Sequence, residues 1–586
     1  MVVSEFEPDD VLNDLNRKFA SVSLEQSKAE SVYKEVLFEE LFEHKQNLST
    51  SNNYLTCYHA IKNIRRYLTQ SISLERIQHV FDLELEDQFI KILESTGYDD
   101  VKYETAWTIT NLAYGTRRHT ARIVESGVID ALVHCFRNTE NYRVKSQCAW
   151  AFANVSIESP TYRELMAQEG LIGDIAAALN FKCDTIYANL NGTLNLQDVK
   201  HTAGDVILDD KADLDDVRDL TWSLANVCRG GFKTVEHWQQ YRTAFDALSQ
   251  CINFHHDDIW TEACWGLSRV LSNMYNYEPF FCTVNLNPKL CPRLIELLRT
   301  DSLELILPVL QTISNFSSGP NDYIEILLNA DLLNYIWWYM SPDIPAPLRR
   351  NALLTISNLA AGNELTVRRV VYNESIMESV ISHIKIPGHE YITEENKWIS
   401  SAAALIPETR EEWTILKESL WVLSNITTLG NNDCICALLR NYNTLIQSLT
   451  SLLHFSRLSS SVCLKVVDCL LKITDRTNQI AELTPPVSPH PRNPYAEEML
   501  RSGVVECLSY LNGEINSAEL AMQSEMLIVT LKNSSPQSSL MDAGLVSAFG
   551  LSNTGHLSTP HVRRIVRGYE DGDVRFIEQA IHSMEL

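Results

Sequence analysis

The sequence has few basic residues for its length, and it lacks a long apolar run. Lys and Arg number 49 against 75 Asp and Glu over 586 residues, which gives a formal charge of −26. A nucleic-acid-binding surface needs a basic face, so this charge argues against that class and favours basic partners. No apolar stretch approaches the ~18 residues that a membrane-spanning helix needs. The N-terminus, MVVSEFEPDD, lacks the basic and then apolar run of a secretory signal.

Signatures of catalysis and of metal binding are also missing. No phosphate-binding loop, GxSxG or HExxH motif occurs. The HHDD run at 255–258 has no further ligand at metal-site spacing, so we expect a solvated turn there. Most of the 14 cysteines lie in helical phrases, where free thiols behave as small apolar side chains. We therefore expect a non-enzymatic, soluble protein without cofactor or metal, in the cytoplasm and nucleus.

A phrase that begins at Ala106, AWTITN, recurs along the chain. It returns as AWAFAN, TWSLAN, CWGLSR, LQTISN, LLTISN and LWVLSN. Equivalent positions are 43 residues apart in three places: Asn111 to Asn154, Asn226 to Arg269, and Asn315 to Asn358. This period is the length of an armadillo or HEAT unit of two or three helices. The sequence therefore predicts an all-α fold, a right-handed superhelical solenoid of about ten armadillo repeats.

The period and its interruptions divide the chain into segments. They are an acidic, largely mobile N-terminal segment (1–53), the repeats (54–555), an acidic loop insertion (about 181–217), a second insertion (about 385–412), a proline-rich loop (484–494) and a C-terminal tail (556–586). Within the first segment, residues 31–42 have the apolar spacing of one amphipathic helix. Glycine is expected at the turn after the first helix of a unit, at Gly127, Gly170, Gly503 and Gly544.

Four of the recurring phrases pair a tryptophan with an asparagine four residues later, on one helix face. Three of the pairs are consecutive, Trp107 with Asn111, Trp150 with Asn154, and Trp222 with Asn226, and the fourth is Trp421 with Asn425. We call the series of recurring phrases the Trp/Asn ladder. A lone tryptophan on an amphipathic helix is usually a core residue, and a lone asparagine is usually a cap. The coupling favours a binding role, because asparagine is a poor mid-helix residue and a core role gives no reason for it to accompany each tryptophan.

Stacked repeats are expected to place the ladder along a concave groove. There each asparagine amide is expected to donate to and accept from the backbone of an extended peptide. Slots between successive tryptophan rings are expected to hold the stems of Lys or Arg, whose charged heads gain about 0.5–2 kcal/mol each from the ring faces. The sequence therefore predicts a short, extended, lysine- or arginine-rich ligand.

The phrases AWTITNLAYGTRRHTARIVESGVIDALV, AWAFANVSIESPTYRELMAQEG and TWSLANVCRGGF resemble the second to fourth armadillo repeats of importin-α (karyopherin-α). CWGLSRVLSN resembles the next repeat, and the resemblance covers about residues 55–550. It implies an adaptor that carries the nuclear localisation signals of cargo proteins. The family's major site corresponds to the three consecutive pairs above, with Glu158 in place of the aspartate that pairs with the key lysine of the signal.

The resemblance also implies a minor site. Its matching residues are Asn315, Asn358, Glu418, Trp421 and Asn425. Leu354 stands where the family has a second tryptophan, and Arg350 or Asn351 stands at a neighbouring acidic position. A leucine supplies no ring face and an added cation repels the ligand, so we expect weak or absent binding at this site.

The N-terminal segment departs from the family. Its members begin with an arginine-rich importin-β-binding segment, which also occupies the groove in cis. Residues 1–53 instead contain 11 Asp/Glu and 5 Lys/Arg, with one adjacent basic pair, Arg17-Lys18. We therefore expect an open groove, and this segment does not support the importin-β partner that the resemblance implies. The same resemblance places the export factor of importin-α at the C-terminal repeats.

Two hypotheses of different classes follow from these observations. The first is a non-catalytic, importin-α-like receptor for basic peptides. The second is an armadillo scaffold or chaperone for one dedicated basic client, such as a histone or a ribosomal protein, that acts independently of importin-β. The acidic N-terminal segment and the acidic insertion motivate the second.

Overall fold

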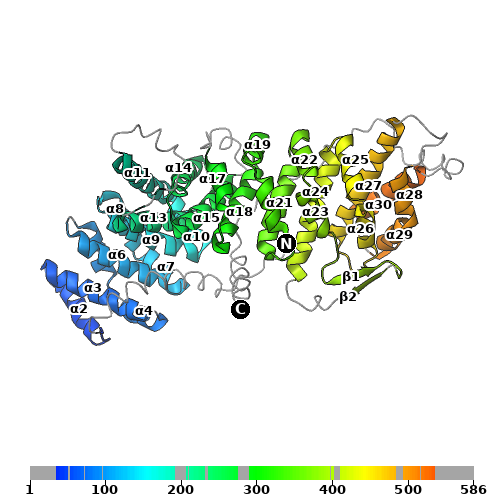
Figure 1. Ribbon diagram of the computed structural model, residues 1–586. Helices are drawn as coiled ribbons and strands as arrows, with labels where there is room; N and C mark the ends of the chain where they lie inside the picture. Colours follow the sequence, from blue (N-terminus) through cyan, green and yellow to red (C-terminus); the bar gives the residue numbers. More distant parts are fainter. Residues whose placement is uncertain are drawn as a thin grey trace. The chain divides into compact units, whose positions relative to one another are not determined.

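The computed structural model describes residues 35–50, 53–71, 73–95, 97–191, 206, 208, 210–230, 235–274, 289–395, 397–400, 409–483, 493–514 and 517–534. These residues form two compact units, with the boundary between Thr312 and Ile313. We call the described residues up to Thr312 unit 1 and those from Ile313 unit 2. Each unit is a stack of α-helices (Figure 1).

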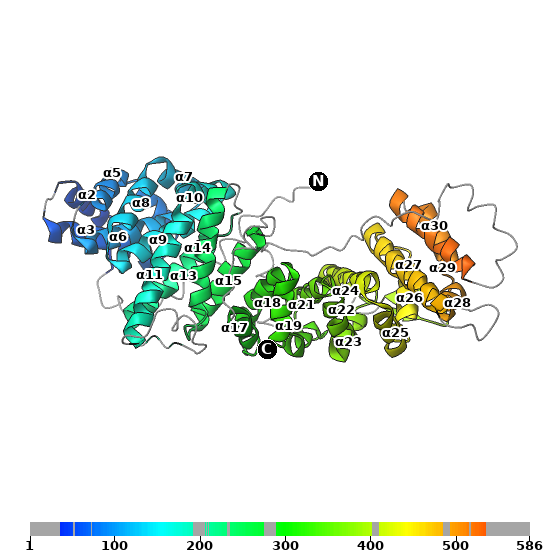
Figure 2. The same ribbon diagram turned by 90° about the horizontal axis from the view of Figure 1, so that it is seen from above.

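Unit 1 repeats a group of three helices, of which the third carries the ladder phrase. Its helices are α2 (Glu40–Thr50), α3 (Tyr54–Gln70), α4 (Leu74–Phe81), α5 (Glu86–Glu94), α6 (Asp99–Ala113), α7 (Arg117–Glu125), α8 (Val128–Asn138), α9 (Tyr142–Glu158), α10 (Pro160–Gln168), α11 (Leu171–Asn191), α13 (Lys211–Val227), α14 (Val235–Cys251), α15 (Asp257–Met274) and α17 (Leu290–Leu297). The third helices α3, α6, α9, α13 and α15 pack in sequence order, and Figures 1 and 2 show them side by side.

Local chemistry explains where these helices begin. An Asn or Asp side chain caps the start of three third helices: Asn53 at α3, Asn141 at α9 and Asp210 at α13. Each accepts a hydrogen bond from an amide of the first turn, which otherwise has no partner. Gly127 and Gly170 have φ values of 81° and 80°, a left-handed conformation that glycine adopts without steric cost. Both lie in the predicted turn between the first and second helices.

Unit 2 continues the same pattern. Helix α18 (Leu303–Ser317) crosses the boundary, and it is followed by α19 (Asn321–Asn329), α20 (Leu333–Ile336), η1 (Trp337–Met340), α21 (Ala346–Ala360), α22 (Glu364–Val371), α23 (Glu374–Ser382), α24 (Thr409–Leu429), α25 (Asn432–Asn441), α26 (Leu445–Leu453), α27 (Ser460–Leu483), α28 (Pro494–Arg501), α29 (Val504–Glu514) and α30 (Ala518–Asn533). The third helices α21, α24, α27 and α30 again pack in sequence order. Gly503, at φ 75°, forms the predicted turn, whereas Gly544 lies outside the described residues.

The prediction of an all-α armadillo fold is confirmed, with one small exception in the second insertion. There β1 (His389–Ile392) and β2 (Lys397–Ser400) form an antiparallel hairpin, in which His389 pairs with Ser400. The Trp398 indole donates a hydrogen bond to the carbonyl of Ser451 at 2.9 Å, which holds the hairpin against α26. The 43-residue period carries no information about an insertion of this kind.

Two local predictions need correction. The acidic loop predicted at 181–217 is wrong at both ends, because α11 continues to Asn191 and α13 begins at Lys211. Cys183, Ile186 and Tyr187 are buried at helical spacing, which explains the longer α11. The helix predicted at 31–42 begins instead at Glu40, where Leu41 is buried as α2 packs on α3. Residues 1–34, 484–492 and 556–586 lie outside the described residues.

Candidate functional site

The three Trp/Asn pairs of unit 1 lie on neighbouring third helices. Trp107 and Asn111 are on α6, Trp150 and Asn154 on α9, and Trp222 and Asn226 on α13. The tryptophan side chains are half-buried, whereas all three asparagines are buried. The rings, rather than the amides, therefore make up the accessible part of the ladder.

The buried amide of Asn154 connects α9 to the preceding unit. Its Nδ2 donates to the backbone carbonyl of Thr110 at 3.1 Å. Thr110 precedes Asn111 and lies in the last turn of α6. The last four carbonyl oxygens of a helix have no regular intrahelical partner, so this bond satisfies one of them.

The same bond recurs at other units. In unit 2, Asn358 donates to the carbonyl of Ser314 at 3.2 Å, and Asn425 donates to that of Ser357 at 2.9 Å. Arg269, which stands at the asparagine position of α15, donates to the carbonyl of Ala225 at 2.7 Å. In each case the acceptor precedes the ladder residue of the unit before, in the last turn of its third helix. We call this contact the inter-repeat staple.

The staple corrects one step of the sequence argument. A core role does give a reason for a buried asparagine in each unit, because its amide joins successive third helices. Two pairs in unit 1 depart from the pattern. Asn226 donates to the carbonyl of Trp222 at 2.9 Å and accepts from Arg229 at 2.9 Å. The amide nitrogen and oxygen of Asn111 and the amide oxygen of Asn154 are buried without a partner among the described residues.

The rings of Trp150 and Trp222 touch each other. Their centroids are 5.3 Å apart and their planes are inclined at 51°. A lysine stem between two rings needs a separation of ~7–8 Å, since carbon atoms pack at about 3.5–4 Å on each side. The prediction of a slot between these rings is therefore wrong for this arrangement. Helix α13 packs directly on α9 despite the long connection after α11, and the two rings form one continuous aromatic surface.

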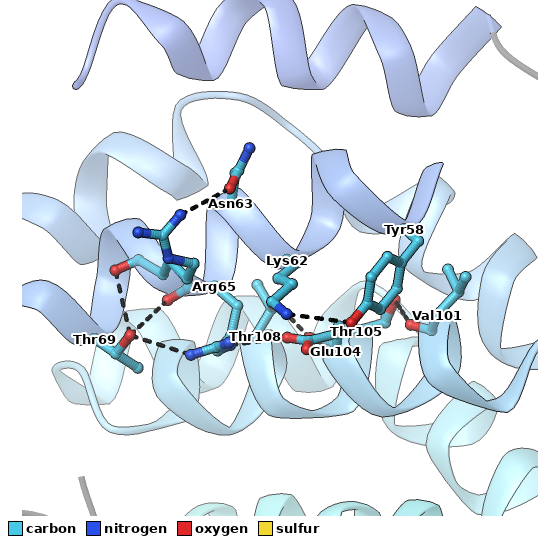
Figure 3. A network of polar contacts seen from close by, with 10 residues as sticks. Tyr58, Lys62, Asn63, Arg65, Thr69, Val101, Glu104, Thr105 and Thr108 are labelled. Carbon is cyan, nitrogen blue, oxygen red and sulfur yellow. Dashed lines mark hydrogen bonds and ion pairs between the residues drawn. The ribbon is translucent and has the colours of Figure 1, made fainter. Parts of the chain in front are cut away.

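One face of Trp107 is covered by the chain itself. The guanidinium carbon of Arg65, on α3, lies 4.0 Å from the ring centroid of Trp107. Arg65 is 1% exposed, and its Nε donates to a carboxylate oxygen of Glu104 at 2.8 Å. Figure 3 shows Arg65, Glu104 and Thr69 in a polar network between α3 and α6. This face of Trp107 is closed to a ligand.

Two carboxylates lie close to the ladder residues of unit 1 in the sequence, Glu158 four residues after Asn154 and Asp219 before Trp222. Glu158 is half-buried at the end of α9, and burial raises its pKa against the opposing effect of Arg117. Burial also raises the pKa of Asp219 to about 6, although the nearby Arg218 guanidinium opposes the shift. The Arg218 guanidinium lies 3.0 Å from Asp219, three residues before Trp222. A ligand cation at Asp219 therefore competes with a cation of the chain.

The residues of the predicted minor site lie on successive helices of unit 2. Asn315 is on α18, Asn358 on α21, and Glu418, Trp421 and Asn425 on α24. Trp421 is half-buried, and the other four are buried. Leu354, which stands at the ladder position of a tryptophan, is also fully buried, as expected of an aliphatic side chain. The Nζ of Lys465 lies 3.4 Å from the ring centroid of Trp421.

The sequence reasoning missed Arg65 and Lys465, which contact the ladder rings. A signal for Arg65 was present, because Ile61, Ile64 and Leu68 mark the buried face of α3 and Arg65 lies within it. A cation on a buried helix face needs a partner. Lys465 is half-buried on α27, and the sequence around it does not mark it as a cation on a buried helix face.

The described residues contain neither a cluster of metal ligands nor a helix that could span a membrane. Among the described residues, no three His, Cys, Asp or Glu side chains are grouped to hold a metal ion. In the same part of the chain, no helix is both long and apolar enough to cross a membrane. The run at 255–258 leads into α15, and His255, Asp257 and Asp258 are exposed.

The fold and the ladder define a protein of armadillo repeats. The family description "Armadillo/beta-catenin-like repeat" matches residues 116–157, which cover α7, α8 and most of α9. An engineered protein of known structure shares the fold, with a TM-score of 0.60 and 16% identity, over 85% of this chain and 100% of that chain.

More specifically, the curated proteins that the chain resembles include importin-α subunits. The chain is 26% identical to importin subunit alpha-1a of Oryza sativa subsp. japonica over 303 residues, which are 51% of each chain. It is 28% identical to importin subunit alpha-1b of the same organism over 265 residues, 45% of this chain and 43% of that one. The chain thus spans about half the length of the curated relatives that it matches.

Proposed function

We propose that unit 1 binds extended, lysine- or arginine-rich segments of partner proteins, as an importin-α-like receptor for nuclear localisation signals. One observation carries the proposal: three Trp/Asn pairs lie on adjacent third helices, and the rings of Trp150 and Trp222 form a half-buried aromatic surface. The similarity to importin-α subunits and the formal charge of −26 support it. A receptor of this kind acts in the cytoplasm and the nucleus.

Cation recognition is proposed at the aromatic surface itself. Stems of Lys or Arg lie across the rings of Trp150 and Trp222, and Glu158 and Asp219 attract the charged heads. The amide oxygen of Asn154 is proposed as the acceptor for a peptide N–H, since it accepts no hydrogen bond from the described residues. Trp107 contributes only its uncovered side, because Arg65 occupies the other.

Substitution of the central rings tests this function. Trp150→Ala and Trp222→Ala are each expected to weaken binding of a labelled octalysine peptide by about 2- to 30-fold, because each ring face contributes about 0.5–2 kcal/mol. Fluorescence anisotropy with the full chain measures the affinity. Trp338→Ala is the matched control, since Trp338 is 59% exposed on η1, outside the ladder. Unchanged affinity in both ladder variants would show that the rings are not the site.

Peptide binding is also expected to depend on pH. Burial raises the pKa of Asp219 to about 6, so this carboxyl loses its charge as pH falls from about 7 to about 5, and burial also raises the pKa of Glu158 above its ordinary value. A neutral carboxyl does not attract a cation, so affinity for octalysine should fall about threefold or more from about pH 7 to about pH 5. A titration series at constant ionic strength measures this. The double variant Glu158→Gln with Asp219→Asn should bind more weakly and lose most of the pH dependence.

The alternative is a chaperone or scaffold for one basic client that acts without importin-β. It is favoured by the 11 acidic against 5 basic residues in residues 1–53. An affinity pull-down with the full chain separates the two proposals. A transport receptor should recover importin-β, the importin-α export factor and several cargoes. A dedicated chaperone should recover one abundant basic protein and neither transport factor.

A further inference from the structure

The ladder of unit 2 contains a lysine in the position that a ligand lysine is expected to take. Lys465 projects from α27 onto Trp421 of α24, and its Nζ lies 3.4 Å from the ring centroid. The two helices are neighbours in the stack. At this distance the ammonium is in the range of a close cation–π contact.

A carboxylate completes the surroundings of this ammonium. Asp468 Oδ2 lies 3.7 Å from Lys465 Nζ and 2.9 Å from Lys472 Nζ. Ser424, three residues after Trp421, donates from its hydroxyl to the same oxygen at 2.7 Å. A ring face with an anchored carboxylate is the chemistry that recognises a primary ammonium.

We propose that Trp421 and Asp468 form a lysine-recognition slot, which Lys465 fills in cis and which a basic ligand enters only by displacing it. The ligand is the side chain of a lysine in a partner protein. The slot rests on the proposed function, because it assumes that the ladder recognises cations. It gives the expected weakness of the minor site a second cause, in addition to sequence departures such as Leu354.

Two further observations fit a displaceable occupant. Burial lowers the pKa of Lys465 and Asp468 opposes the shift, so the carboxylate only partly offsets the desolvation that Lys465 undergoes in the slot. Unit 1 shows a related arrangement, in which Arg65 covers a face of Trp107. Arg65 differs in being fully buried and tightly paired with Glu104, so it is a fixed part of the core. Lys465 is half-buried, and its Nζ lies farther from its carboxylate, at 3.7 Å from Asp468 Oδ2.

Removing the occupant should open the slot. The experiment uses the full chain carrying Trp150→Ala and Trp222→Ala, so that the proposed site of unit 1 does not contribute. In that background, Lys465→Ala is expected to raise the affinity for labelled octalysine at least tenfold, as measured by anisotropy. Adding Trp421→Ala should abolish the gain. If Lys465→Ala unfolds unit 2, Lys465→Met retains the stem and removes only the ammonium.

Lys472→Ala is the matched control for charge. This variant removes one cation from the same helix and takes one partner from the same carboxylate. Among the described residues it is Lys465, and not Lys472, whose ammonium contacts the Trp421 ring. An equal gain in Lys472→Ala, or a gain that survives Trp421→Ala, would overturn the slot, and so would no gain in Lys465→Ala. Failure of the proposed function looks different, because the unsubstituted chain would then bind octalysine no better than the Trp150→Ala, Trp222→Ala variant.

Discussion

Replacement of Glu104 by alanine is expected to lower the free energy of unfolding of the α3–α6 region by about 3–5 kcal/mol, because it leaves a buried cation without its carboxylate. Glu104 and Arg65 have side chains that are 7% and 2% exposed, and they are joined at 2.8 Å. The guanidinium keeps its contacts with Trp107 and Thr69, but neither carries a negative charge.

The measurement should be local because the chain contains two units, and a global unfolding curve need not be two-state. Hydrogen exchange of the α3 and α6 amides reports the stability of this region. Glu75→Ala is a suitable control, because the Glu75 side chain is 82% exposed and its contact with His79 is long, at 3.9 Å. The double variant Arg65→Met with Glu104→Leu should recover most of the loss, because a well-packed apolar pair replaces a buried ion pair at little cost.

A loss below about 0.5 kcal/mol in Glu104→Ala would contradict the buried ion pair, since that is the size of a typical surface effect. If the double variant were as unstable as the single one, the loss would come from packing rather than from charge. The result bears on the site as well. A stable Arg65–Glu104 pair fixes the covered face of Trp107, so that the proposed binding of basic ligands is expected on the Trp150 and Trp222 side of the ladder.

The 43-residue period was sufficient to predict the fold and to place each Trp/Asn pair on a third helix. A period compares equivalent positions, so it detects whatever every unit shares. It is insensitive to contacts between different positions of adjacent units. Arg65 and Glu104 are 39 residues apart, which differs from the 43-residue period, so the repeat does not predict that they form a pair.

The role of the ladder asparagine was predicted incompletely for a related reason. The staple acceptor is a backbone carbonyl, which every residue possesses and no letter of the sequence marks. The donor is visible, since Asn154, Asn358 and Asn425 recur in register, but its partner is not. The contact of Trp150 with Trp222 was also not predicted, because the sequence places the two rings on successive repeats but does not give the distance between them.

Replacement of Asn358 by alanine tests the inter-repeat staple, and it is expected to destabilise unit 2 by about 2–3 kcal/mol, through two lost hydrogen bonds and the cavity left by the amide. Asn358 is 0% exposed, and its Nδ2 donates to the Ser314 carbonyl at 3.2 Å and the Ser317 hydroxyl at 3.1 Å. Hydrogen exchange of α18 and α21 should therefore accelerate together, because the staple joins both helices.

Asn334→Ala provides the comparison, because Asn334 is an exposed helical asparagine of α20 in the same unit, and its loss should change stability by less than about 0.5 kcal/mol. Asn358→Asp separates the two roles of the ladder asparagine. A carboxylate retains an acceptor for a peptide N–H but has no hydrogen to donate to Ser314. If the asparagine acts chiefly as a staple, Asp is as destabilising as alanine. An Asp variant as stable as the unsubstituted chain would leave the peptide-clamp role as the reason for the asparagine.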